Sequence, residues 1–165
     1  MSQSKFNDIV NTLGPRLLNF AAKQIDNMDI AKDLVQDTFI IYLDKQSEVL
    51  SGKEKSFLFK VLSNKILDHF KLKKNNIDFT LVNLGTTDNS NDYEAKQIIN
   101  MALLHLKPLP RQLITLRDLE GYKYEDIAEM LDISLGQVKV NLFRARKKLK
   151  EEVIQLDLRY EQSNK

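Results

Sequence analysis

Apolar residues recur every three or four positions along most of this chain, which is the spacing of one face of an α-helix. In the N-terminal half this pattern predicts a helix or helix pair over residues 5–25 with a break at Gly14 and Pro15, a helix over residues 30–45, a polar loop over residues 46–56 and a helix over residues 57–74. Asp29 stands where the N-cap of the second helix is expected.

The helical pattern resumes at Glu94 and continues to the C-terminal region. It predicts a helix that ends before Pro108, a helix that begins at Pro110 and ends near Gly121, a helix over residues 124–131, and a last helix that begins after Ser134 and runs past Lys150. Proline in the first helical turn and glycine just past the last turn are common helix boundaries. The pattern therefore predicts an all-α fold.

The last two helices are separated by only Asp132, Ile133 and Ser134, which is the length of a tight turn. Ser134 is a good N-cap, and Gln137 three residues later completes the pattern of a capping box. The turn requires a left-handed backbone at Asp132, which aspartate tolerates better than most residues. These features predict a helix-turn-helix, a motif whose second helix commonly enters the DNA major groove.

Residues 75–94 differ in composition from both flanks, because they are rich in Asn, Asp and Thr. The first half of this stretch is also unusually apolar. We interpret it as an acidic, flexible linker between two small helical domains. The N-terminal domain is predicted to span residues 1–74 and the C-terminal helix-turn-helix domain residues 95–160, followed by a fraying tail over residues 161–165.

Composition narrows the possible classes of protein. The 165 residues include no Cys, which excludes disulfides and thiolate metal sites, and the two His have no partner at metal-ligand spacing, so we expect no metal and no other cofactor. No apolar run is long enough to span a membrane, which predicts a cytoplasmic protein without direct membrane insertion. The net charge of +2 is too small to indicate nucleic-acid binding, so any DNA-binding charge must be local.

Such a local charge lies on the predicted helix after the turn. Its apolar stripe is Val138, Leu142, Ala145, Leu149 and Val153, and no acidic residue occurs between Gln137 and Lys150. A solvated lysine-rich helix would also fit, but the preceding turn favours DNA recognition. The candidate DNA-binding residues are Gln137, Lys139, Val140, Phe143, Arg144, Arg146 and Lys147.

Two N-terminal helices also carry polar outer faces. On the helix over residues 30–45 this face is acidic, with Asp33, Gln36, Asp37 and Asp44. Such a face is usually solvated surface, and the alternative is a docking face for a basic partner. On the helix over residues 57–74 the outer face holds Lys60, Ser63, Asn64 and Lys71.

Residues 29–39, 56–74, 106–131 and 133–151, in this order, resemble the extracytoplasmic-function (ECF) sigma factors, the compact promoter-specificity subunits of bacterial RNA polymerase. The resemblance implies that Asp33, Gln36 and Asp37 contact core RNA polymerase, and that the helix after the turn reads the −35 element of promoter DNA. It also implies an anti-sigma factor as a further partner. The linker would then lie in the RNA exit region of the polymerase.

For the −10 element the resemblance implies a loop and helix where an extruded base can be stacked or hydrogen-bonded in a pocket. By this resemblance, the residues expected to bind the −10 element are Lys55, Ser56, Phe57, Lys60, Asn64, Lys71 and Lys74, with Lys73 beside them. Several positions depart from the family pattern. Phe57 stands where Trp is common, Lys123 where a capping Ser is common, and Asp132 where Gly is common. Val140 and Asn141 stand where small or basic residues are common, and Val140 cannot donate a hydrogen bond to a base.

Two alternative functions remain open from the residues themselves. One is an ordinary helix-turn-helix transcriptional regulator whose N-terminal helices form a sensor or dimerisation domain. The other is an enzyme, for which the sequence offers no Gly-rich phosphate loop, no metal cluster and no nucleophile–base pair.

Overall fold

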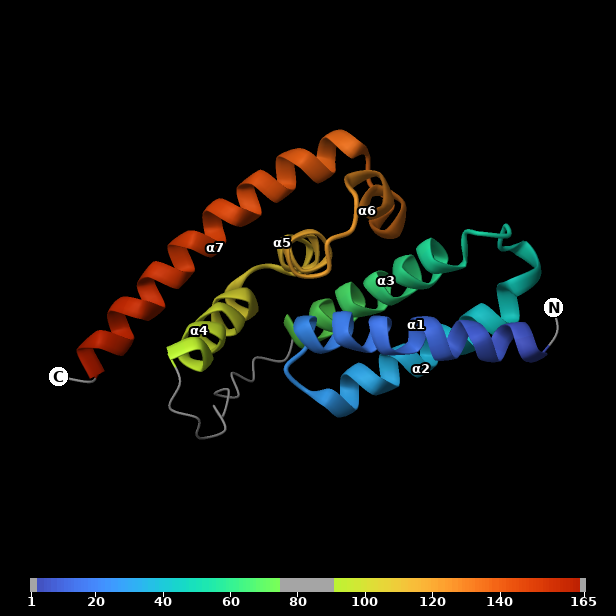
Figure 1. Cartoon of the computed structure of the whole chain (residues 1–165), viewed down its shortest axis with the longest axis horizontal. Coiled ribbons are helices and arrows are strands. Elements are labelled where there is room, and N and C mark those ends of the chain that lie inside the picture. The colour runs from blue at the N-terminus through green and yellow to red at the C-terminus, as the bar shows by residue number, and fades with distance from the viewer. Residues whose placement is uncertain (1–2, 75–90, 164–165) are drawn as a thin grey trace.

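The computed structural model describes residues 3–74 and 91–163, and within these ranges every element is helical. The elements are α1 (Gln3–Gln24), α2 (Met28–Lys45), η1 (Gln46–Glu48), α3 (Glu54–Lys74), α4 (Asn91–His105), α5 (Pro108–Ile114), η2 (Thr115–Leu119), α6 (Tyr124–Leu131) and α7 (Leu135–Ser163) (Figure 1). The all-α prediction is confirmed. Most of the stretch interpreted as a linker, including its apolar half, lies outside the described residues, but α4 already begins at Asn91, so the predicted end of the linker at residue 94 is wrong.

Helix α1 is continuous, so the predicted break at Gly14 and Pro15 is wrong. Leu13 and Leu17, on either side of the proline, are both buried against the neighbouring helices. Phe39 lies 4.0 Å from where a Cβ on Gly14 would stand, so the α2 side chain packs closely there. Burial of this face offsets the backbone hydrogen bond that the proline removes.

The starts of α2 and α3 also differ from the prediction. Asn27, and not Asp29, caps α2, because its side-chain oxygen accepts a hydrogen bond from the Ile30 amide at 3.1 Å. Helix α3 begins at Glu54, whose carboxylate favours the positive end of the helix dipole. Lys55 and Ser56 therefore lie in the first turn of the helix, where periodicity alone predicts the end of a loop.

The C-terminal helices follow the prediction more closely. The capping box is formed, since the Gln137 amide donates to Ser134 Oγ at 3.1 Å and the Ser134 amide donates to Gln137 Oε1 at 2.9 Å. Asp132 has the left-handed backbone that the turn requires, with φ of 55°. Two boundaries are wrong: α5 begins at Pro108, two residues before the predicted start, and α7 remains helical to Ser163, past the expected start of the tail.

Replacing Ser134 with alanine is expected to lower the free energy of unfolding by about 1 kcal/mol, because the hydroxyl satisfies an amide in the first turn of α7. Urea unfolding followed by circular dichroism measures the loss. Ser134→Asp, which keeps a cap acceptor, is the control and should stay close to the native value. Equal losses in the two variants would contradict a capping role.

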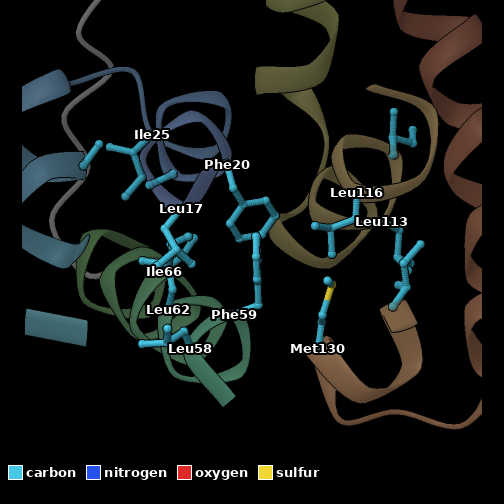
Figure 2. Packing of buried hydrophobic residues seen from close by; sticks show 14 of the residues in the cluster. Leu17, Phe20, Ile25, Leu58, Phe59, Leu62, Ile66, Leu113, Leu116 and Met130 are labelled. Atoms are coloured by element: carbon cyan, nitrogen blue, oxygen red, sulfur yellow. The ribbon is translucent and has the colours of Figure 1, made fainter. Parts of the chain in front are cut away.

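Helix α3 packs against α5 and α6, and α1 packs against α4 and α5 (Figure 1). Phe20 of α1 and Phe59 of α3 meet edge to face at 5.5 Å between ring centroids, and Phe59 meets Tyr122 at 5.7 Å. Figure 2 shows Phe20 and Phe59 between the leucines of the N-terminal helices and Leu113, Leu116 and Met130. One apolar core therefore extends across both halves of the chain.

Buried polar side chains also join the two halves. Ser63 Oγ of α3 donates to Gln112 Oε1 at 2.6 Å, and Gln24 Nε2 of α1 donates to Thr115 Oγ1 at 2.9 Å. Ser63 is therefore covered by α5, although helical periodicity places it on the outer face of α3. A polar residue on an outer face can be buried when another part of the chain supplies its hydrogen bond.

Arg111 is the most enclosed cation at this junction. Its guanidinium donates to the carbonyl oxygens of Leu103 (2.8 Å), Leu104 (2.9 Å) and Leu106 (2.7 Å) at the end of α4, and to that of Gln24 at the end of α1. Burial lowers the pKa of Arg111 to about 10, which still leaves the group cationic at neutral pH. The side chain thus satisfies the last carbonyls of two helices from different halves of the chain.

Candidate nucleic-acid interface

The first candidate surface is the outer face of α7. Val138, Leu142 and Ala145 are buried, which turns the opposite side of the helix to solvent. Phe143 is 73% exposed and Val140 is 50% exposed, so two apolar side chains lie three positions apart on this face. Lys139, Arg144 and Lys147 are exposed beside them. The sequence-predicted face is therefore brought together as one basic surface with an apolar centre.

A shallow hollow of about 480 Å³ lies where the turn meets α7. It is lined by Ser134, Gly136, Gln137, Val140, Asn141 and Arg144. Asn141 is absent from the predicted set, although its position next to Val140 could have suggested it. Because asparagine can bond an adenine through two atoms, Asn141 adds a hydrogen-bonding group beside Val140, which has none.

Two predicted α7 residues are already engaged within the protein. The side chain of Gln137 is held in the capping box. Arg146 forms a bidentate pair with Asp118, with Nε–Oδ2 at 3.0 Å and Nη2–Oδ1 at 2.6 Å. The hydrogen bond to Asp118 raises the pKa of Arg146 above its ordinary value. Arg146 therefore joins α7 to η2, and a phosphate would have to share it with Asp118.

The second candidate surface lies at the start of α3. An open hollow of about 340 Å³ is lined there by Lys45, Glu48, Val49, Leu50, Lys53, Ser56, Phe57, Lys60 and Glu129. Phe57 lies in its wall and packs on Tyr42, with ring centroids 6.1 Å apart. Sequence reasoning missed Lys53, Val49 and Leu50, because they fall in a stretch read only as a polar loop. The sequence signal that could have pointed to them is Leu50, an apolar residue in an otherwise polar loop. In the structure Leu50 is 74% exposed.

The remaining residues predicted for this second surface are not gathered in one place. Lys55 lies over the Tyr122 ring, 5.1 Å from its centroid, and Lys60 pairs with Asp132 at 3.3 Å. Asn64 and Lys71 are exposed farther along α3. The side chain of Lys74 lies outside what the structure describes. The start of α3 thus contacts α6 and the turn after it, whereas the exposed side chains of Asn64 and Lys71 lie farther along the helix.

A third surface follows the outer face of α2. Asp33, Gln36 and Asp37 are all exposed along it, as their spacing predicts. Ile40, which is 58% exposed, and Leu43 extend the same side of the helix. The acidic face thus continues into an apolar one that sequence reasoning did not include. Exposed apolar side chains beside charges are typical of a protein-binding surface.

Within the described residues, no group of His, Asp and Glu is placed to hold a metal ion. In the same ranges no helix is both long and apolar enough to cross a membrane.

A basic helix-turn-helix and a second helix with exposed lysines on one all-α chain are typical of a DNA-binding protein. Comparison with known families gives the class more narrowly. Residues 9–75 match the model of Sigma-70 region 2, and residues 96–149 match the model of Sigma-70, region 4. Together the two matches cover more than half of the chain.

Comparison with whole proteins indicates the same family. RNA polymerase sigma factor YlaC of Bacillus subtilis is 26% identical, and the match covers 87% of this chain and 89% of that protein. RNA polymerase sigma factor CarQ of Myxococcus xanthus is 24% identical, with 95% and 94% covered. The sigma factor RpoE of Bartonella quintana, solved in complex with the anti-sigma factor NepR, matches with a TM-score of 0.69 at 26% identity over 93% of this chain and 98% of that one.

The chain therefore belongs to the sigma-70 family, and within it to the ECF sigma factors of bacterial RNA polymerase. It is an initiation factor that acts with core RNA polymerase on promoter DNA, and it is not an enzyme. The alternative of an ordinary helix-turn-helix regulator is not favoured, because its N-terminal helices match region 2 of sigma factors.

Proposed function

We propose that three helices of this sigma factor bind three different targets. Helix α7 binds the −35 element, α3 with its hollow binds the −10 element, and α2 docks on core RNA polymerase. The observation that carries the proposal is the exposed basic face of α7, with Phe143 and Val140 at its centre. On a −35 duplex, Lys139 and Lys147 would neutralise phosphates, and Arg144 would reach base edges. Val140 would contact a thymine methyl.

At the −10 element the hollow beside Phe57 would receive an extruded base. The ring of Phe57 offers a stacking surface, and Lys53 and Lys60 are close enough to hold the adjoining phosphates. Asn64, Lys71 and Lys74 would continue this track along α3. We add Lys53 to the proposed −10 residues because its side chain lines the hollow.

On α2, Asp33, Gln36 and Asp37 would face a basic surface of the polymerase, with Ile40 and Leu43 packing beside them. We assign docking and −10 recognition to residues 1–74 and −35 recognition to residues 91–163, with the stretch between them as the linker. The protein would act in the cytoplasm. An anti-sigma factor is a further proposed partner, since RpoE was solved with one bound and Phe143 offers an apolar contact.

Transcription in vitro with purified core RNA polymerase tests the proposal. Start sites are first mapped in cells that overexpress the protein, which supplies promoters for the assay. Core polymerase should initiate at these promoters only when the protein is added. Tight DNA binding by the free chain, with no stimulation of core polymerase at any mapped promoter, would contradict the proposal.

Arg144→Ala is expected to lower transcription from a −35-dependent promoter by about tenfold or more, because a bidentate base contact is lost. Binding to core polymerase should not change. Arg159→Ala is the matched control, since Arg159 is exposed on the same helix far from the turn. The two variants should differ in promoter titrations. An equal loss of transcription in both variants would show that Arg144 contributes only its positive charge and makes no specific base contact.

A further inference from the structure

The charge of α7 changes sign halfway along the helix. Its first half, residues 137–150, is basic and holds no acidic residue. Its second half, residues 151–163, holds one cation and exposes three acidic residues, Glu151, Asp157 and Glu161. Promoter DNA can explain only the first half, because phosphates repel carboxylates. The match to Sigma-70, region 4 ends at residue 149, so the acidic half also lies beyond it.

Two exposed apolar side chains lie in the acidic half as well. Ile154 is 51% exposed and Leu158 is 55% exposed. Leu158 stands about five full helical turns after Val140, and Ile154 stands about three turns after Phe143, so all four lie on the same side of the helix. One apolar stripe therefore runs along the outer face of α7, through a basic half and then an acidic half.

The packing of α4 fixes which side of the acidic half faces solvent. Leu156 is buried, and the Tyr160 hydroxyl donates to Glu94 of α4 at 2.9 Å. Helix α7 runs along one edge of the molecule, with α4 on its inner side (Figure 1). Ile154 and Leu158 therefore point away from the rest of the protein. Aligned apolar side chains on an outer face are typical of a protein-binding surface.

We propose that two copies of this protein pair through the outer faces of α7, with the two helices antiparallel and a two-fold axis at the level of Leu149. In this register, residues equally far from Leu149 lie opposite each other. Val140 therefore meets the partner's Leu158, and Lys147 meets the partner's Glu151. The basic half of each helix lies on the acidic half of the other. Such an interface is isologous, so every contact occurs twice.

Phe143 is the largest apolar contact of the pair. In this register its ring lies between the partner's Ile154 and the partner's Leu158, in the hole that neighbouring side chains of a facing helix form. A single pair of helices buries less surface than a standard protein–protein interface, so the dimer is weak, with a dissociation constant of about 10–100 μM. The pairing does not depend on the −35 role proposed for α7.

Sedimentation velocity of the full-length protein, at concentrations on both sides of this dissociation constant, tests the pairing. The wild type is expected to change from monomer to dimer across the range. Ile154→Gln combined with Leu158→Gln should dimerise at least about tenfold more weakly, because the apolar contacts with Val140 and Phe143 are lost while helix propensity is kept. A wild type that stays monomeric throughout would overturn the pairing, and a different basic protein would then be the partner of this face.

Leu72→Gln combined with Ile99→Gln is the matched control, since Leu72 on α3 and Ile99 on α4 are both exposed. This variant loses the same kind of apolar surface away from α7 and should dimerise like the wild type. Circular dichroism checks that both double variants keep the helical fold. Equal weakening in the two variants would show that general surface hydrophobicity drives the association, and this would overturn the pairing.

A charge exchange tests the antiparallel register. Lys147→Glu and Glu151→Lys each place like charges opposite each other in a pair of identical copies, so each variant alone should dimerise more weakly than the wild type. In an equimolar mixture the two kinds of copy bring opposite charges together at both contacts, and dimers should form again. Glu151 lies 3.9 Å from Lys148 of its own helix, but so long and exposed a pair competes only weakly. A mixture that dimerises no better than its components would overturn the proposed pairing.

Discussion

Arg111→Ala is expected to lower the free energy of unfolding by about 3–5 kcal/mol, one of the two largest effects that this structure predicts. The guanidinium bonds four carbonyl oxygens at the ends of α1 and α4. It also lies over the Phe70 ring, 5.0 Å from the centroid. Alanine would remove a donor from each of these carbonyls, of which that of Leu103 keeps the bond from the Leu106 amide, and would open a cavity at the junction of the two halves.

Urea unfolding measures this loss, with two variants for comparison. Arg111→Lys keeps the charge but not the planar fork, so its ammonium can reach fewer of the carbonyls, and an intermediate loss is expected. Arg117→Ala is the matched control, since Arg117 donates to only one carbonyl, that of Tyr122 at 2.9 Å, and should cost about 1 kcal/mol. A loss at Arg111 no larger than at Arg117 would contradict this account of the junction.

The features that could be predicted from the sequence are local ones. The turn at Asp132 and the capping box of Ser134 and Gln137 depend on residues within six positions of one another. The outer face of α7 was also predictable, because a strict apolar stripe fixes which side of a helix is buried. Phe143 is exposed because its position on the helix is opposite Val138 and Leu142.

The features that could not be predicted depend on contacts between distant parts of the chain. Ser63 bonds Gln112, which lies 49 positions away, and helical periodicity cannot show that one polar residue covers another. Arg111 looks like an ordinary surface cation in the sequence, and only the ends of α1 and α4 around it explain its burial. Pro15 breaks a helix by its local chemistry, and only tertiary packing keeps α1 continuous.

The same division applies to the candidate sites. The acids on α2 were found from spacing alone, because nothing else in the described chain covers that face. At the start of α3, the family resemblance pointed to Ser56, Phe57 and Lys60 but not to Glu129, which comes from the other half of the chain. A surface formed by both halves of the chain cannot be predicted completely from the spacing of residues along one helix.

The second large effect is expected on polymerase binding. Asp33→Lys combined with Asp37→Lys should lower the affinity for core RNA polymerase by about a hundredfold or more, because two attractive charges at a basic docking surface become repulsive. Both residues are exposed, so the free energy of unfolding should change little. Fluorescence anisotropy of the labelled protein, titrated with core polymerase at fixed ionic strength, measures the affinity.

Asp8→Lys combined with Asp26→Lys is the matched control, since both aspartates are exposed on or beside α1 and the net charge changes equally. The control should bind polymerase like the wild type if the charges act locally on α2. The docking variant should keep the single-strand affinity of the control, whereas Arg144→Ala should keep the polymerase affinity. These opposite outcomes follow only if α2 and α7 act on different partners. Loss of the same step in both variants would show that docking and promoter reading share one surface.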